Sequence, residues 1–311
     1  MLHDIAEDVR RNDDSRARRV GAVVRAARRQ APAKARDQNE DRQGSKENGS
    51  HHRNGREGGY HSQIDAVTAN EIELAYGTRT VVTAATFTVP SGAVTAVIGP
   101  NGAGKSTVLH AIAGLLRPRS GTLAVPAAAR RGGVAYVLQA TAVNQHLPLT
   151  VRETVTMGRY ATTGPWRRLD ADDRAAVESA LHALSITDLA RRPLHELSGG
   201  QRQRAFVAQG LAQGADLLLL DEPITGLDLV SRQHILDAIS AERASGRAVV
   251  VSTHDLGDAA AADHLLLLAG RVVASGTADQ VLTDTHLADA YGGHLLRIGE
   301  RTLILDDHPH H

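Results

Sequence analysis

The sequence predicts an α/β fold whose core is a mostly parallel β-sheet covered by helices. Two observations support this prediction. Four short segments are almost continuously apolar, as strands buried on both faces of a sheet are. Alanine-rich stretches of helical length, including 170–185 and 227–244, separate or follow them. The four expected core strands are 93–98, 134–138, 217–220 and 248–252.

An antiparallel hairpin is expected before the first core strand. Apolar and polar residues alternate over 71–76 and 81–89, as in strands with one exposed face, and Gly77 provides a turn between them. A second hairpin is expected over 265–273, turning near Gly270, and a last strand at 302–305. The sequence shows no internal repeat, so we expect one set of site motifs per chain.

The composition excludes several classes of function. The 35 basic and 35 acidic residues give a net charge of zero, which argues against a partner held mainly by counterion release, such as duplex DNA. The absence of cysteine excludes disulfides, thiolate catalysis and Cys-ligated zinc. No apolar run approaches the ~18 to 20 residues that cross a bilayer, and the N-terminus lacks the apolar stretch of a signal peptide, so a cytosolic chain is expected.

The N-terminal residues differ in composition from the rest of the chain. Residues 1–62 hold 14 basic and 10 acidic residues, and 30–62 contain almost nothing that could enter a core. We therefore expect a disordered, polar, Arg-rich extension over 1–62. A basic amphipathic helix at 15–29 that touches anionic lipid is the alternative to a solvated tail. The ordered domain is expected over 63–300, and a terminal strand with a His-rich tail over 301–311.

A glycine-rich loop follows the first expected core strand and precedes an apolar helix expected at 108–116. It has the pattern G-x-x-x-x-G-K-S, which in this strand-loop-helix context is typical of a phosphate-binding P-loop. Glycines let backbone N–H groups and the helix N-terminus approach phosphate oxygens closely. Lys105 is expected on the β and γ phosphates of ATP, and Ser106 on Mg²⁺. The predicted loop residues are Gly99, Pro100, Asn101, Gly102, Ala103, Gly104, Lys105, Ser106 and Thr107.

Lysine is rare in this chain, and its position is informative. Arginine outnumbers lysine by 32 to three, and Lys105 is the only lysine from residue 47 to the end. A skew of this kind is typical of a GC-rich coding sequence. The lysine that remains therefore indicates a position where the wider, planar guanidinium cannot replace a compact ammonium.

Two acidic residues, Asp221 and Glu222, follow the leucine-rich strand 217–220. By itself this pattern is as typical of a buried strand that meets a loop as it is of a catalytic site. In a chain with a P-loop, however, an acid at the end of a neighbouring strand is where a group that binds the magnesium is expected. The sequence predicts Asp221 for the metal and Glu222 for the base that orients and polarises the attacking water.

The segment 197–201 reads Leu-Ser-Gly-Gly-Gln and precedes another expected helix. Here the sequence resembles the ATP-binding cassette (ABC) ATPases, in which LSGGQ is the signature motif. The resemblance covers about residues 64–298, and other family motifs follow in the family's order. It implies an adenine-stacking tyrosine, a Q-loop glutamine that serves catalysis and the metal, a D-loop aspartate and a switch histidine that contacts the γ phosphate. The residues matched to these motifs are Tyr76, Gln139, Ser198, Gly199, Gly200, Gln201, Asp228 and His254.

The resemblance also implies an architecture and an assembly. The fold is expected to be a P-loop NTPase ABC cassette with an N-terminal antiparallel β subdomain and a helical signature subdomain at about 140–205. ATP and Mg²⁺ are the expected cofactors. The chain is expected to form an ATP-sandwich homodimer, in which Ser198 and Gly200 of one subunit cap the γ phosphate that Lys105 of the other subunit holds.

The segment that follows the Q-loop is similar to that of metal and iron-chelate importers. Residues 140–160, from Ala140 to Tyr160, are therefore expected to dock on an integral membrane permease that works with an extracytoplasmic substrate-binding protein. Residues 221–228 and 290–295 resemble zinc and manganese importers more than siderophore importers. The expected function is the ATPase of a divalent-metal importer at the cytoplasmic face of the membrane, with no nucleic-acid partner. An iron-siderophore or haem importer, or a soluble ABC ATPase outside transport, are the alternatives.

Overall fold

The computed structural model describes residues 65–138, 149–164, 166–292, 295–298 and 301–304. The chain divides into two units, residues 1–63 and 64–311, and every described residue belongs to the second. The extension predicted over 1–62 and the histidines of the tail lie outside the described residues.

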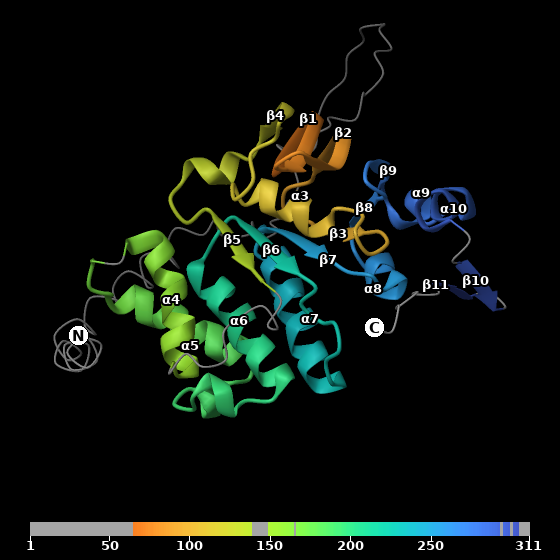
Figure 1. The fold of residues 1–311 in the computed structure, drawn as a ribbon. Helices are drawn as coiled ribbons and strands as arrows, with labels where there is room; N and C mark the ends of the chain where they lie inside the picture. Colours follow the sequence, from red (N-terminus) through yellow and green to blue (C-terminus); the bar gives the residue numbers. More distant parts are fainter. Residues whose placement is uncertain (1–64, 139–148, 165, 293–294, 299–300, 305–311) are drawn as a thin grey trace, which may run out of the picture. The chain divides into compact units, whose positions relative to one another are not determined.

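The core is a six-stranded sheet with the order β5-β6-β7-β3-β8-β9 (Figure 1). The first five strands in this order run parallel, and β9 is antiparallel to β8. Each apolar run of the sequence forms one of these strands, and the predicted α/β fold class is confirmed. The bounds are β3 (Val94–Ile98), β5 (Val134–Val137), β6 (Leu217–Asp221), β7 (Ala248–Ser252), β8 (His264–Leu268) and β9 (Val272–Gly276).

The core strands are apolar throughout because both faces of the sheet are covered. On β6, Leu217 and Leu219 pack toward α3 (Lys105–Ile112), whereas Leu218 and Leu220 pack toward the helices on the other face. All four leucines are buried. A fully buried side chain of this size contributes about 1.5 to 3 kcal/mol, so these strands stabilise the fold substantially.

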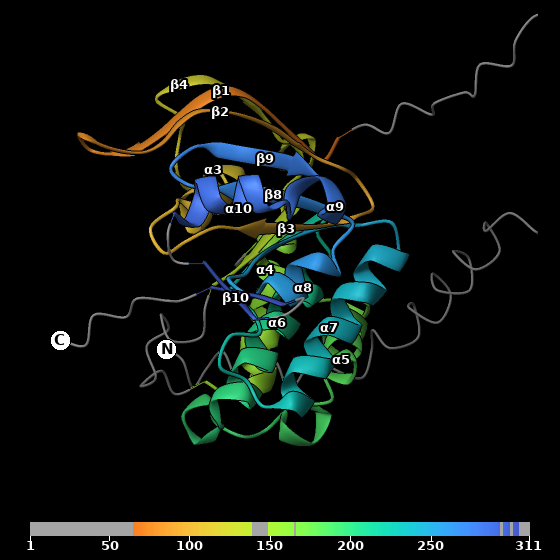
Figure 2. The ribbon, with the colours of Figure 1, turned by 90° about the vertical axis from the view of Figure 1, so that its right-hand side faces the viewer.

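A second sheet covers the outer side of α3. It is antiparallel, with the order β2-β1-β4, and its bounds are β1 (Val67–Tyr76), β2 (Arg79–Val89) and β4 (Ser120–Ala124). Figures 1 and 2 show α3 between this sheet and the core sheet, and the three form one apolar cluster. The hairpin of β1 and β2 was predicted, but β4 was not, because most of its residues are exposed and carry no apolar signal.

Helices cover the opposite face of the core sheet. The elements α4 (Val151–Thr163), α5 (Ala171–Ala183), α6 (Gly199–Gln213) and α7 (Leu229–Ala244) lie there (Figure 2). Reciprocal capping boxes fix the starts of three of them, through Thr150 with Glu153, Asp170 with Asp173, and Ser198 with Gln201. Short 3₁₀ helices at Pro126–Ala129, Thr187–Leu189 and Leu194–Glu196 join neighbouring elements.

The C-terminal elements cover the remaining part of the core sheet. Helices α8 (Leu256–Ala260), α9 (Ala278–Val281) and α10 (Asp284–Tyr291) pack against β3 and β8. A two-stranded hairpin of β10 (Leu295–Ile298) and β11 (Arg301–Ile304) follows them. The strand predicted at 302–305 overlaps β11, and its last residue lies outside the described residues. Within the part of the chain that the structure describes, no helix has the length and apolar character needed to span a bilayer.

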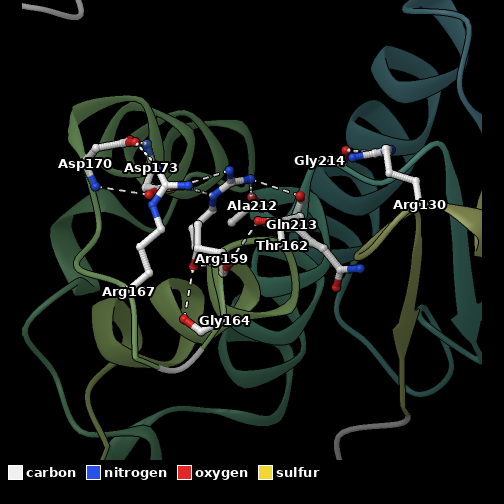
Figure 3. A network of polar contacts seen from close by, with 11 residues as sticks. Arg130, Arg159, Thr162, Gly164, Arg167, Asp170, Asp173, Ala212, Gln213 and Gly214 are labelled. Carbon is white, nitrogen blue, oxygen red and sulfur yellow. Dashed lines mark hydrogen bonds and ion pairs between the residues drawn. The ribbon is translucent and has the colours of Figure 1, made fainter.

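One partly buried arginine joins the three helices α4, α5 and α6 (Figure 3). From α4, Arg159 forms an ion pair with Asp173 in the first turn of α5, at 2.9 Å. The same guanidinium donates to the carbonyl oxygens of Ala212 (2.7 Å) and Gln213 (2.9 Å), at the end of α6. A cation is favoured at a helix C-terminus, where the carbonyl groups lack partners within the helix.

Replacing Arg159 with alanine is expected to destabilise the protein strongly, because it leaves the buried carboxylate of Asp173 without its partner. Removing one member of a buried pair costs about 3 to 5 kcal/mol. Arg130→Ala is the matched control, since Arg130 forms an exposed pair with Asp216 that is worth about 0 to 1 kcal/mol. Urea unfolding of the two variants measures the difference in the free energy of unfolding. Equal losses of stability would contradict a special structural role for the Arg159–Asp173 pair.

Candidate functional site

The P-loop is shaped by glycines that no other residue could replace. Gly99 has a φ of 146°, and a Cβ atom there would lie 2.1 Å from the carbonyl oxygen of Leu268. Gly104 has a φ of 100°, and its Cβ would lie 2.4 Å from a methyl carbon of Val82. The loop is therefore held tightly between β8 and β2.

Helix α3 begins at Lys105, three residues earlier than its apolar pattern predicts. Its N-cap is Gly104 in a left-handed conformation, and no side chain caps the first turn. The first N–H groups of a helix have no acceptor within it, so the start of α3 is suited to bind an anion. This N-terminus is formed by Lys105, Ser106 and Thr107, which the sequence motif predicts to contact the phosphates.

Lys105 reaches back across the loop. Its side chain is buried, and its ammonium Nζ donates to the carbonyl oxygens of Gly99 (2.8 Å) and Pro100 (3.2 Å). The loop is also tied to the β8–β9 turn, because the N–H of Gly270 donates to the carbonyl oxygen of Ala103 (3.0 Å). Lys105 thus brings a positive charge to the centre of the loop that contains Asn101 and Gly102.

The two predicted acids lie at the carboxyl end of β6, in the same sheet as the P-loop strand. Between β6 and β3 runs β7, in which Ser252 pairs in register with both Asp221 and Val97. The carboxyl ends of parallel strands meet at one edge of a sheet, and ligands of open α/β sheets bind outside that edge. The structure thus brings Asp221 and Glu222 to the edge from which the P-loop extends.

Glu222 has an unusual backbone conformation, with a φ of 46°. This left-handed region costs a residue with a side chain about 1 to 2 kcal/mol. The following residue is Pro223, which restricts the backbone of Glu222 further. Such strain is concentrated at functional sites, where the surrounding structure holds it in place.

Two further residues contact the acidic pair, and the sequence motifs did not indicate them. The hydroxyl of Ser252 donates to Asp221 Oδ1 (2.6 Å) and accepts from the N–H of Glu222 (2.9 Å). The phenol of Tyr136, from β5, donates to Asp221 Oδ2 (3.1 Å). Burial raises the pKa of the Tyr136 phenol, and the charge of Asp221 raises it further, so the phenol keeps its proton. The sequence feature that could have indicated both residues is their position near the carboxyl ends of core strands.

Tyr76 lies at the end of β1 with 48% of its surface exposed. Its hydroxyl is 2.7 Å from Nδ1 of His110 in α3, and the His110 ring meets the Tyr136 ring edge to face, with centroids 5.5 Å apart. An exposed aromatic ring that is fixed by a hydrogen bond of its hydroxyl is suited to stack on a nucleotide base.

The structure describes the residue predicted as the switch histidine but not the one predicted as the Q-loop glutamine. His254 is exposed and lies two residues after Ser252, just beyond the end of β7. Gln139 lies outside the described residues. The neighbouring Leu138 is described and has 45% of its surface exposed.

The signature residues form the start of α6, where they contact one another and the start of α7. Ser198 and Gln201 cap the helix reciprocally. A Cβ atom on Gly200 would lie 2.6 Å from Asp228 Oδ2 and 2.5 Å from the hydroxyl of Ser231, whereas one on Gly199 would meet nothing within 4 Å. Asp228 in turn caps α7 by accepting from the N–H of Ser231 (2.8 Å), a bond that lowers the pKa of this carboxyl.

The oxygen groups at this edge suit a magnesium ion bound together with phosphates. Ser106 offers an exposed hydroxyl, and each carboxylate oxygen of Asp221 accepts one hydrogen bond, which leaves further lone pairs. Among the described residues, no group of three or more His, Asp or Glu forms a metal site. Mg²⁺ usually binds through one or two protein oxygens plus substrate phosphates, so this donor set fits it.

The sequence matches known proteins over most of the described unit. Residues 82–225 match the family model described as ABC transporter. The zinc transport system ATP-binding protein TroB of Treponema pallidum is 38% identical over 74% of this chain and 88% of its own length. The manganese transport system ATP-binding protein MntA of Synechocystis is 38% identical over 67% and 83%. The iron(3+)-hydroxamate import ATP-binding protein FhuC of Bacillus subtilis is 34% identical over 73% and 88%.

The fold also matches solved structures. A chain of a transporter described as metal-chelate type, solved in an inward-facing conformation, superposes with a TM-score of 0.66. It is 27% identical in sequence, and the match covers 77% of this chain and 96% of that one. Together with the P-loop, the acidic pair and the signature helix, these similarities establish that the chain belongs to the ATP-binding proteins of ABC transporters and is an ATPase.

Proposed function

We propose that this protein is the ATP-hydrolysing subunit of an ABC importer that takes up a divalent metal ion, zinc or manganese. The observation that carries the proposal is the similarity to zinc and manganese transport ATP-binding proteins over most of their lengths. An iron-chelate importer is the second candidate, because the similarity to an iron(3+)-hydroxamate import protein is only slightly lower.

The chemistry follows from the site. The loop N–H groups and the Lys105 ammonium hold the β and γ phosphates, and Tyr76 stacks on the adenine. Glu222 orients and polarises the attacking water, aided by Gln139 and His254. Ser106, Asp221 and Gln139 would hold Mg²⁺, which would neutralise charge on the phosphates. These roles rest on the family motifs and, for Asp221 and Glu222, on their place at the sheet edge from which the P-loop extends.

The active form is an ATP-sandwich homodimer. The N-terminus of α6, with Ser198, Gly199 and Gly200, is a second anion-binding helix start, and it faces the γ phosphate bound by the partner subunit. Directly after Asp228, the side chains of Leu229 and Val230 are exposed by 84% and 63%. Exposed apolar side chains beside a motif of this kind favour a subunit interface.

The permease docks on the segment after the Q-loop. Of the predicted surface, 149–160 are described, and they include most of α4, where Met157 has 45% of its surface exposed. In this arrangement the subunit lies at the cytoplasmic face of the membrane, and an extracytoplasmic binding protein delivers the ion. Docking on α4 would transmit the state of the nucleotide site to the permease through α6, which packs against α4.

Transport by the reconstituted complex tests the proposed function. The ATPase, its permease and its binding protein are placed in proteoliposomes and supplied with zinc, manganese or an iron-hydroxamate chelate. ATP-dependent uptake of zinc or manganese is expected, with stimulation of ATP hydrolysis by the same ion. Uptake of the iron chelate alone would favour the second candidate, and a lack of association with any membrane protein would contradict a role in transport.

Glu222→Gln is expected to lower ATP turnover by about 100-fold or more, because the amide keeps the shape of the side chain but cannot act as a base. ATP binding is expected to persist, so MgATP should convert the variant into a stable dimer. Turnover and light scattering measure the two effects. A variant that hydrolyses ATP at the wild-type rate would remove Glu222 from this role.

Gly200→Ala is expected to destabilise the monomer, because the new methyl group overlaps Asp228 and Ser231. Overpacking of this kind costs about 1 to 3 kcal/mol, which exceeds the gain of about 1 kcal/mol from alanine in a helix. Gly199→Ala is the matched control one residue away, where the methyl group meets no atom of the described residues within 4 Å. Thermal unfolding without nucleotide should lower the midpoint for the first variant and leave it unchanged or raise it for the second.

A further inference from the structure

The side chain of Ser252 connects the two predicted catalytic acids. It is fully buried at the end of β7, and its hydroxyl makes two hydrogen bonds at once. It donates to Asp221 Oδ1 at 2.6 Å and accepts from the backbone N–H of Glu222 at 2.9 Å. One hydroxyl therefore fixes the side chain of one acid and the backbone of the next.

The backbone of Glu222 needs such a restraint. Its φ of 46° is unfavourable for any residue except glycine, and Pro223 limits it further. The bond to Ser252 holds the N–H in the direction that this conformation requires. Without it, the residue can relax to an ordinary conformation, which would change the direction of the Glu222 side chain.

The carboxylate of Asp221 is restrained from two sides. Ser252 reaches Oδ1 from β7, and Tyr136 reaches Oδ2 from β5 at 3.1 Å. The Tyr136 ring is itself held edge to face against His110 of α3. Since β5 and β7 are the two neighbours of β6, the carboxylate is held in one plane by both adjoining strands.

Ser252 also belongs to the strand that joins the acids to the P-loop. It pairs in register with Val97 of β3, and the N–H of the next residue, Thr253, donates to the carbonyl oxygen of Val97 at 3.1 Å. The P-loop begins two residues after Val97. The position of Ser252 therefore sets the acids relative to the loop that holds the phosphates.

We infer that Ser252 is a positioning residue for ATP hydrolysis, which locks Asp221 and Glu222 in one arrangement relative to the P-loop, with Tyr136 as a second restraint on Asp221. The inference rests on the proposed roles of the two acids. A serine that only stabilised the sheet would affect folding, whereas a positioning serine affects turnover and the contribution of magnesium to nucleotide binding.

The test compares Ser252→Ala with Ser252→Thr, which keeps the hydroxyl, and with Tyr136→Phe, which removes only the phenol oxygen. Loss of a group that orients a metal-binding residue typically lowers metal affinity or activity by about 10- to 100-fold. Ser252→Ala is expected to lower the turnover number by at least about tenfold, with a much smaller change in KM. Ser252→Thr should restore most of the turnover, and Tyr136→Phe should show a smaller loss than Ser252→Ala.

Thr95→Val is the matched control. Thr95 is a fully buried hydroxyl residue in the neighbouring strand β3, and its hydroxyl has no hydrogen-bond partner among the described residues. The substitution removes a hydroxyl from the same sheet without touching either acid, so turnover should remain within about twofold of wild type. A loss as large as that of Ser252→Ala would show that the sheet is merely sensitive to substitution.

A second measurement does not depend on hydrolysis. Binding of a fluorescent ATP analogue is titrated with magnesium and in EDTA. Ser252→Ala should bind the analogue in EDTA as wild type does, but gain about tenfold less affinity from magnesium. Equal loss under both conditions, or wild-type turnover in Ser252→Ala, would overturn the inference.

The same titration in the Glu222→Gln background separates the two hypotheses. If Glu222 is not the base, Glu222→Gln keeps its turnover, yet the effect of Ser252→Ala on magnesium-dependent binding persists through Asp221. If instead Ser252 has no positioning role, Glu222→Gln loses turnover as expected and Ser252→Ala leaves the magnesium dependence unchanged.

Discussion

The site depends on the register in which β3, β7 and β6 pair. Val97 lies opposite Ser252, and Ser252 lies opposite Asp221, so the three strands end at one level. Register is normally specified by an apolar and a polar face, but these strands are apolar on both faces, and a slip by one residue would expose little. Polar groups at the strand ends therefore carry much of the specificity. The bond from the Ser252 hydroxyl to the Asp221 carboxylate joins two particular side chains, so it forms in one register only.

The signature helix and the D-loop form one unit within a chain. Gly200 lies so close to Asp228 and Ser231 that only a hydrogen atom fits, and Asp228 also caps α7. A shift of the start of α6 must therefore move the start of α7. In a head-to-tail dimer, each subunit would present both motifs to its partner as a rigid pair. The nucleotide could then be sensed by two motifs although only one of them touches the γ phosphate.

The sequence predicted the elements whose pattern depends on burial, and it missed contacts that depend on register. The core strands were evident because burial on both faces leaves continuous apolar runs. Strand β4 was not, since its mostly exposed residues follow no pattern. The start of α3 was placed too late, because the left-handed conformation of Gly104, rather than an apolar residue, sets its first turn. Ser252 and Tyr136 reach Asp221 from strands distant in sequence, so no local motif could indicate them.

Lysine at position 105 is explained by the geometry of the loop. Several arginines elsewhere form exposed, planar pairs, such as Arg271 with both carboxylate oxygens of Asp289, each at 2.7 Å. Lys105 is buried, and it donates to two adjacent carbonyl groups of its own loop. A compact, tetrahedral ammonium can donate to both of these closely spaced oxygens. A guanidinium is wider, and the loop cannot expand to hold it because Gly99 is already in contact with the backbone of Leu268. Compositional pressure toward arginine therefore stops at Lys105, where steric fit, rather than charge, selects the residue.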